Sequence, residues 1–252
     1  MIETQKKLEL DIIYNQDCME GMKLLPNKSI DMILCDLPYG TTQCKWDTII
    51  PFDSLWNEYK RIIKDNGAIV LTSAQPFTSL LISSQINLFK YNWIWEKSKA
   101  TGYLNSKKRP LIAHEDILIF SKKQTIYNPQ MTPGEPYYKG KAHRPTEVYG
   151  KQKEILVENK DGLRYPRTVQ YFKTAESEGQ IYHPTQKPIA LFEFLIKTYT
   201  NENDIVLDNC IGSGTTAIAC KNLNRHFIGY ETNQKYFDIT NQRLKEYKND
   251  RK

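Results

Sequence analysis

The chain has 252 residues, 40% of them hydrophobic, and a formal net charge of +6. This size fits one large α/β domain with an insertion, or a domain with a smaller lobe, and the apolar content is enough for a hydrophobic core. The sequence has no run of about 18 apolar residues, and its amino terminus lacks the apolar core of a signal peptide, so we expect a cytoplasmic protein without membrane contact. The positive charge is compatible with a polyanionic partner but does not require one.

The cysteines give no indication of a metal site. They form neither a Cys-x-x-Cys pair nor a spacing with histidine that suits zinc. We therefore expect no metal, and reduced, mainly structural thiols at Cys18, Cys35, Cys44, Cys210 and Cys220.

Strand-like and helix-like segments alternate along most of the chain. Short apolar runs predict strands, and apolar residues at helical spacing predict helices. The expected strands are 10–14, 30–35, 68–72, 91–95, 116–120, 203–208 and 227–231. The expected helices are 18–25, 51–64 with a stop at Asn66 and Gly67, 76–89, one beginning near Pro188, one running through Cys220, and 232–248. This alternation predicts an α/β fold with a doubly wound, mostly parallel sheet. Trp56, Trp93 and Trp95 are expected in its core.

Asp36-Leu37-Pro38-Tyr39 directly follows the expected strand at 30–35. Open α/β sheets bind their ligands beyond the carboxyl ends of strands. Pro38 has no N–H and keeps Leu37 extended, so the Leu37 carbonyl is expected to be free as an acceptor beside Asp36, while Tyr39 offers an aromatic face. Two acceptors and a ring suit the exocyclic amine of a base outside its stack, although a plain Asp-x-Pro turn fits these residues equally well. We expect the polar loop that ends at Asp47 to close over a substrate.

A glycine-rich turn follows the expected strand at 203–208. Its sequence, Asn-Cys-Ile-Gly-Ser-Gly-Thr at 209–215, brings backbone amides close to a ligand, which the missing side chains of Gly212 and Gly214 let approach. The next strand ends at Glu231, a placement that binds ribose hydroxyls in nucleotide folds, with a helix cap as the alternative. The spacing also suits a nicotinamide dinucleotide, but the three-glycine fingerprint is incomplete.

These motifs together resemble the permuted, or beta, subgroup of DNA amino-methyltransferases that use S-adenosylmethionine. Asp-Leu-Pro-Tyr is similar to the Asp-Pro-Pro-Tyr signature, and His-Pro-Thr-Gln-Lys-Pro at 183–188 matches a further family element. The base motif precedes the cofactor motif, with an insertion between them, as in that subgroup. The resemblance covers nearly the whole chain and implies a Rossmann-like methyltransferase fold with S-adenosylmethionine as cofactor.

The resemblance also implies roles for individual residues. Asp36, Leu37, Pro38 and Tyr39 would bind and activate the target amine. The cofactor would be held by Asp17, Cys18, Lys187, Asp208, Gly212, Ser213, Gly214, Thr215 and Glu231. Two plainer alternatives stay open, since Asp17 could cap a helix and His183 could be a local turn histidine. The chain departs from the family at Leu37, which replaces a Pro, and at Asn209-Cys210, which replace a Pro-Phe pair whose ring normally packs on the cofactor.

Two basic regions are candidates for contact with DNA. Residues 97–109 contain no acidic residue, and we expect a loop there whose cations contact phosphates, with a merely solvated loop as the alternative; the cations are Lys97, Lys99, Lys107, Lys108 and Arg109. Residues 122–182 contain eleven Lys and Arg against seven Asp and Glu, a net +4, with many tyrosines among them. The resemblance implies that this loop-rich insertion recognises the target sequence, and that 1–121 and 183–252 form the catalytic and cofactor-binding domain.

We therefore expect a site-specific methyltransferase acting on the N6 amine of a flipped adenine in double-stranded DNA. A cytosine N4 methyltransferase is the alternative within the class, and Asp36 favours adenine because Ser is common there in cytosine enzymes. A DNA-binding protein that keeps the fold without catalysis is the alternative from another class. The sequence leaves open the recognition site, a homodimer and a cognate restriction endonuclease.

Overall fold

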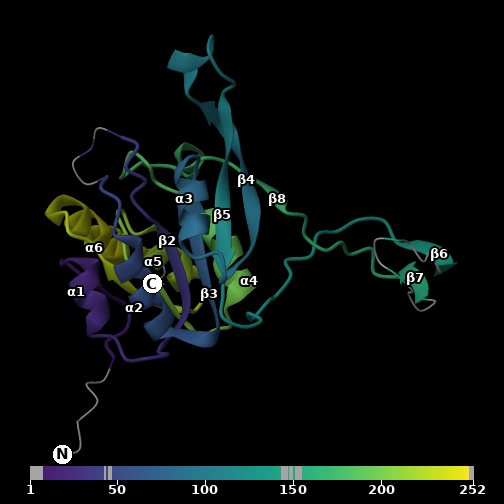
Figure 1. Cartoon of the computed structure of the whole chain (residues 1–252), viewed down its shortest axis with the longest axis horizontal. Coiled ribbons are helices and arrows are strands. Elements are labelled where there is room, and N and C mark those ends of the chain that lie inside the picture. Colours follow the sequence, from purple (N-terminus) through teal and green to yellow (C-terminus); the bar gives the residue numbers. More distant parts are fainter. Residues whose placement is uncertain are drawn as a thin grey trace, which may run out of the picture. The chain divides into compact units, whose positions relative to one another are not determined.

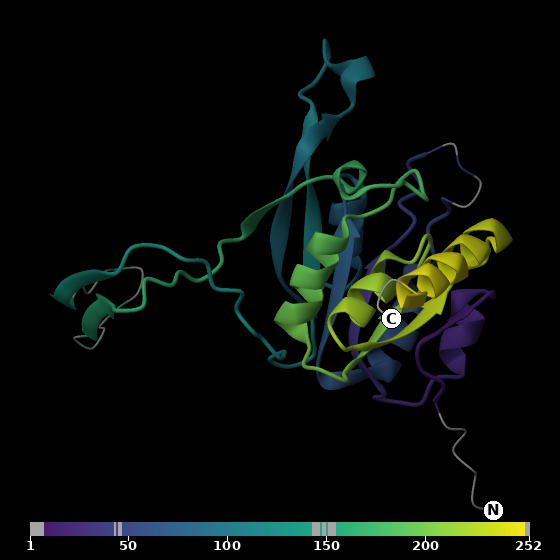
Figure 2. The same cartoon turned by 180° about the vertical axis from the view of Figure 1, so that it is seen from behind.

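The chain divides into two compact units, which are described separately. The computed structural model describes residues 8–42, 44, 47–142, 147, 150 and 155–249. One unit consists of Met1–Asn128 with Thr168–Lys252, and the other of Pro129–Arg167. The first contains an eight-stranded sheet and the second a two-stranded sheet (Figures 1 and 2). Within the described ranges, no helix is long and apolar enough to cross a membrane.

The large sheet has the strand order β1-β10-β9-β2-β3-β5-β4-β8. All neighbouring strands are parallel except that β5 runs antiparallel to β3 and β4. The strands are β1 (Ile12–Tyr14), β2 (Ile30–Asp36), β3 (Ile63–Ser73), β4 (Phe89–Thr101), β5 (Ile112–Phe120), β8 (Val169–Phe172), β9 (Ile205–Asp208) and β10 (His226–Tyr230). The prediction of a mostly parallel sheet is thus confirmed.

Helices pack on both faces of this sheet, which is the doubly wound arrangement. Ile33 and Cys35 of β2 pack in the hydrophobic cluster that contains residues of α1, α2 and α3. Met32 and Leu34, which point to the opposite face, pack with residues of α4 and α5. The helices are α1 (Cys18–Lys23), α2 (Phe52–Ile62), α3 (Phe77–Ser84), α4 (Ile189–Tyr199), α5 (Thr215–Asn222) and α6 (Gln234–Asn249), with 3₁₀ turns η1 (Tyr103–Asn105) and η2 (Ala175–Glu178). The three tryptophans expected in the core are buried.

The region around residues 97–109 is not the loop that the sequence predicted. β4 continues to Thr101 and β5 begins at Ile112, and together they form a long antiparallel hairpin with η1 near its tip (Figure 1). The connection contains no α-helix, and so short a turn can join only antiparallel neighbours. Lys97 and Lys99 therefore lie on a strand.

The expected helix stop at Asn66 and Gly67 is also wrong. β3 begins at Ile63, directly after α2, so both residues lie within the strand. A Cβ atom at Gly67 would lie 2.6 Å from the carbonyl oxygen of Asp31 in β2. The glycine therefore allows a close approach of two strands.

The strand order brings distant parts of the chain to one edge of the sheet. β9 lies between β2 and β10, and all three are parallel, so their last residues, Asp36, Asp208 and Tyr230, share that edge. Because β5 runs the opposite way, its amino-terminal part with Glu115 reaches the same edge. This is where ligands of open α/β sheets bind.

The second unit is built on an antiparallel hairpin of β6 (Tyr137–Ala142) and β7 (Ile155–Asn159). An antiparallel bridge joins Thr132, which precedes β6, to Arg164, which follows β7. The Arg164 guanidinium lies 4.9 Å from the centre of the Tyr137 ring. This unit falls inside the expected insertion at 122–182, whose residues 143–146, 148–149 and 151–154 lie outside the described part of the chain.

Candidate active site

A cavity of about 710 Å³ lies at this edge of the first unit. The cavity is lined by the ends of β2, β9 and β10 with the loops that follow them, by the loop after β1, and by residues of β4, β5 and 181–187. The lining contains most of the residues predicted for the base and the cofactor, namely Asp17, Cys18, Asp36, Leu37, Pro38, Tyr39, Lys187, Asp208, Gly212, Ser213, Thr215 and Glu231. Two motifs that are far apart in the sequence thus share one cavity.

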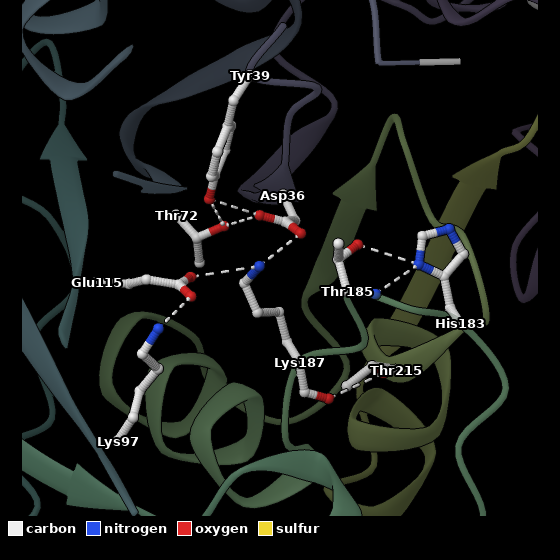
Figure 3. Close-up of polar contacts among 9 residues, drawn as sticks. All are labelled: Asp36, Tyr39, Thr72, Lys97, Glu115, His183, Thr185, Lys187 and Thr215. Atoms are coloured by element: carbon white, nitrogen blue, oxygen red, sulfur yellow. Dashed lines mark hydrogen bonds and ion pairs between the residues drawn. The ribbon is translucent and has the colours of Figure 1, made fainter. Parts of the chain in front are cut away.

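The Asp36 carboxylate is the centre of a polar cluster (Figure 3). Its Oδ1 accepts a hydrogen bond from the Tyr39 hydroxyl at 2.8 Å and another from the Thr72 hydroxyl at the end of β3. Burial and the nearby Asp36 raise the pKa of Tyr39 well above its usual value, so its hydroxyl keeps the proton that it donates. The Tyr39 ring stacks on Phe77, with centroids 5.0 Å apart. These contacts fix the carboxylate at the wall of the cavity.

Lys187 provides the third contact of Asp36. Its Nζ lies 2.7 Å from Asp36 Oδ2 and 3.4 Å from Glu115 Oε2 (Figure 3). Burial alone would lower the pKa of this ammonium, but the carboxylates of Asp36 and Glu115 raise it to about 12. Lys187 is therefore charged throughout the physiological range.

Lys97 lies in this charged cluster and not on an exposed surface. Its side chain is 5% exposed, and Nζ lies 3.3 Å from Glu115 Oε1. The predicted location of Lys97 on a phosphate-contacting loop is wrong, because β4 continues past this residue. Sequence reasoning did not find Thr72 or Glu115, because Thr72 is 36 residues from Asp36, and Glu115 is more than 70 residues from Lys187 in the sequence.

The glycine-rich turn supplies an opening into the cavity at Gly212. Gly212 has φ +52°, and no heavy atom comes within 3.9 Å of the position that a Cβ atom would occupy. Gly214 differs, since a Cβ atom there would clash with the Thr240 side chain of α6, and Gly214 does not line the cavity. The prediction that both glycines line the pocket therefore needs a correction at Gly214, which allows the turn to pack on α6.

Asp208 is buried next to this turn. Its Oδ1 accepts from the Cys210 N–H at 3.1 Å, and its Oδ2 accepts from the Thr216 hydroxyl in α5. Burial raises the pKa of Asp208 to about 7, although these two hydrogen bonds act in the opposite direction. A cationic group in the cavity would favour the ionised form.

Glu231 connects the end of β10 with the glycine-rich turn. Its carboxylate accepts from the Gly212 N–H at 3.0 Å and from the Asn233 N–H at 2.7 Å. Burial raises its pKa. The alternative role as the cap of the last helix is taken by Asn233, whose side chain accepts from the Lys235 N–H at the start of α6.

Asp17 and His183 also make the local contacts that the plainer alternatives predicted. Asp17 caps α1, accepting from the N–H groups of Met19 and Glu20, and it lines the cavity as well. His183 Nδ1 lies 3.2 Å from the Thr185 N–H, and its ring lies against Tyr236 with centroids 4.2 Å apart. These contacts do not test a role in cofactor binding, which stays a prediction for Asp17.

Asn209 and Cys210, which replace the family's Pro-Phe pair, join a buried polar group. Asn209 accepts a hydrogen bond from the Tyr59 hydroxyl and donates to the sulfur atoms of Cys18 and Cys210. All of these side chains except Cys210 are buried. Polar contacts therefore hold this part of the cavity wall, where the resemblance implies an aromatic ring.

The remaining predicted cations lie away from the cavity. Lys99 is exposed on β4, and Lys107, Lys108 and Arg109 are exposed in the turn after η1, none of them in the cavity lining. The side chains of Tyr103 and Leu104 at the same hairpin tip are 80% and 97% exposed.

The Asp47 carboxylate holds the loop that precedes it, accepting hydrogen bonds from the N–H groups of Gly40, Thr41 and Thr42. Positions 43, 45 and 46 of this expected lid lie outside the described residues.

The chain is similar to known DNA methylases. A family model described as DNA methylase, of the N6/N4 type, matches residues 30–242. The Type II methyltransferase M.HinfI of Haemophilus influenzae is 30% identical over 95% of this chain and 69% of its own length. The Type II methyltransferase M.HpaI of Haemophilus parainfluenzae is 29% identical over 90% of this chain and 72% of its own length.

Two solved structures have a similar fold. The complex of M1.HpyAVI with SAM is 28% identical, with a TM-score of 0.64 over 92% of this chain and 98% of that one. The cytosine-N4-specific PvuII DNA methyltransferase is 18% identical, with a TM-score of 0.66 over 92% and 85%. At this lower identity the likeness concerns the fold alone.

Proposed function

The chain belongs to the N6/N4 DNA methylase family, and from this premise we propose that it transfers a methyl group from S-adenosylmethionine to the N6 amine of an adenine in double-stranded DNA. The observation that carries the proposal is the single cavity that Asp36 and Tyr39 share with the turn at Gly212. A base amine and a methyl donor have to meet in one enclosed space for direct transfer. Methyl transfer to DNA follows from the family, and adenine is the finer part of the proposal.

Asp36 is suited to activating an aromatic amine. The lone pair of such an amine is delocalised into the ring, which makes it a poor nucleophile. Two of the carboxylate's roughly four acceptor positions bind Tyr39 and Thr72 and a third binds Lys187, which leaves room for an N–H of the base. By accepting that N–H, Asp36 favours the pyramidal nitrogen of the transition state. Stacking of the base on the Tyr39 ring would contribute about 1–3 kcal/mol.

The cofactor half of the cavity has the groups that S-adenosylmethionine requires. Glu231 would provide acceptors for ribose hydroxyls, Asp208 would bind the α-ammonium, and the missing side chain of Gly212 would leave space for the ligand. When bound, the cofactor supplies a methyl group on a positively charged sulfur; the amine gains the methyl and releases one proton, and the sulfonium becomes a thioether. The released proton passes to the carboxylate that accepted the N–H, or to water.

The preference for adenine rests on Asp36, because Ser is common at this motif position in cytosine enzymes. Incubation with isotope-labelled cofactor and duplex DNA, followed by nucleoside mass spectrometry, should find N6-methyladenine. N4-methylcytosine alone would overturn the choice of base. Absence of any methylated nucleoside, with DNA still bound, would favour the alternative of a DNA-binding protein without catalysis.

We assign recognition of the DNA to two surfaces. The cations at the tip of the β4–β5 hairpin are suited to phosphate contact, and the residues of 122–182, with the compact unit Pro129–Arg167, to reading bases. The relatives are named Type II methyltransferases, and by extension we propose that methylation protects sites from a cognate restriction endonuclease. A homodimer stays a prediction from the sequence.

A further inference from the structure

Four charged side chains of alternating sign lie in a row at the base-binding end of the cavity. Lys97 in β4 lies 3.3 Å from Glu115 in β5, Glu115 lies 3.4 Å from Lys187, and Lys187 lies 2.7 Å from Asp36 (Figure 3). The side chains are 5%, 16%, 8% and 23% exposed in the same order. Asp36 ends β2, Lys97 lies in β4, Glu115 in β5 and Lys187 in the segment before α4, so four separate elements contribute to the row.

Lys187 and Glu115 form an ion pair in which the ammonium makes no hydrogen bond to the carboxylate. Glu115 Oε2 is inaccessible to solvent and has no hydrogen-bond partner among the described residues, and its distance to Lys187 is longer than that of Asp36. A buried carboxylate oxygen without a hydrogen bond is unfavourable. A lysine ammonium has three donors in a compact head. Glu115 is therefore a second acceptor within reach of the same ammonium.

The position of this ammonium affects what Asp36 can do. An ammonium held at 2.7 Å occupies one acceptor position of Asp36 and offsets its negative charge. The target amine becomes more positive as its bond to the methyl group forms, so a carboxylate whose charge is less compensated stabilises that state better. A shift of Lys187 away from Asp36 would therefore help the reaction.

We propose that Glu115, held by Lys97, is a positioning residue that draws Lys187 away from Asp36 when the target amine binds. The inference rests on the proposed function. Lys97 keeps the Glu115 carboxylate in place from its far side, so that the ammonium moves between two fixed acceptors. No proton has to change place in this step.

Steady-state methylation of duplex DNA by Glu115→Gln provides the test. Without the second carboxylate Lys187 stays on Asp36, so kcat should fall by about tenfold to a hundredfold, while KM for DNA and for the cofactor stays within about twofold. Glu96→Gln is the matched control, because it makes the same change on neighbouring β4 at an exposed position opposite His114. Its kinetics should equal those of the wild type.

A second comparison separates positioning from general stability. In a Lys187→Met background the ammonium is missing, so adding Glu115→Gln should change kcat by less than about twofold. If Glu115→Gln does not fold, Glu115→Asp, which keeps the charge but withdraws it from Lys187, should also lower kcat without raising KM. A Glu115 variant with the kinetics of the control, or the same fold loss of kcat from Glu115→Gln in the Lys187→Met background as in the wild type, would overturn the inference. An inactive wild type would instead contradict the proposed function.

Discussion

Asp36 accepts hydrogen bonds from Tyr39 and Thr72 and pairs with Lys187, so its carboxylate is held in one orientation before any substrate binds. Asp36→Asn keeps the shape of the side chain but removes its charge. The lost interaction acts mainly in the transition state, so we expect kcat to fall by about two to three orders of magnitude while DNA and cofactor affinities change only a few-fold. Single-turnover methylation with separate binding assays measures both. Near-normal turnover would refute the role of Asp36.

Asp208 is expected to make the binding of S-adenosylmethionine depend on pH. Burial raises the pKa of its carboxyl to about 7 in the free protein, so below that pH the group is increasingly protonated and neutral. Binding an ammonium requires the carboxylate, and affinity for S-adenosylmethionine should therefore fall by up to about tenfold per pH unit below pH 7. Calorimetry over a pH series measures this slope. Asp208→Asn should bind more weakly and lose the slope, whereas an unchanged slope in that variant would assign it to another group.

At the scale of elements, the two glycines of the turn before α5 should fail differently. Gly212→Ala places a methyl group at a positive φ in the cavity wall without a clash, so we expect a loss of about 1–2 kcal/mol in the free energy of unfolding and a clear loss of cofactor affinity. Gly214→Ala adds a clash with Thr240, whose hydroxyl donates to the Gly212 carbonyl at 2.7 Å. Its loss of stability should be larger, about 2–4 kcal/mol. Chemical denaturation and calorimetry compare the two variants. A Gly214→Ala variant that keeps its stability and loses only cofactor affinity would show that Gly214 lines the pocket.

The tip of the β4–β5 hairpin should bind DNA without regard to sequence. Replacing Lys107, Lys108 and Arg109 by Ala should weaken binding to cognate and other duplexes alike and flatten the dependence of affinity on salt, since each phosphate contact contributes about 0.9 to the slope. Leu104→Ala is the control, because it changes the same exposed tip without changing charge. A triple variant that keeps its salt slope but alters the methylated sequence would show that the tip reads bases.

The sequence predicted those elements whose pattern is local. The strand before Asp36 and the helix after Pro188 follow from apolar runs and spacing, and both are present as β2 and α4. The antiparallel course of β5 could not be read in this way, because pairing depends on which strands meet in three dimensions. The same limit applies to the site: the motif identified Asp36, but Glu115 reaches it only through the hairpin and Lys187.

At the scale of the whole molecule, one cavity is formed by segments that lie far apart in the sequence. β2 and β9 are neighbours in the sheet, so the base motif and the cofactor motif meet although most of the chain lies between them. The compact unit Pro129–Arg167 lies in the intervening stretch, and none of its described residues lines the cavity. This arrangement predicts that catalysis and sequence recognition can be changed separately.

The exposed tyrosines of that unit provide the test. Tyr138 and Tyr165 are 71% and 73% exposed, whereas Tyr137 is packed against the Arg164 guanidinium. A contact with a base carries about 1–3 kcal/mol of discrimination. Tyr138→Ala and Tyr165→Ala should therefore relax the methylated sequence at individual positions, with little change in kcat on the preferred site or in the salt dependence of binding. Sequencing of modified bases in DNA from an expressing host, with in vitro kinetics on the preferred duplex, measures both effects. Arg164→Ala, which removes the support of Tyr137, should relax the sequence more broadly. If all three variants methylate the same sites as the wild type, recognition lies elsewhere in the chain, and the β4–β5 hairpin is the next region to change.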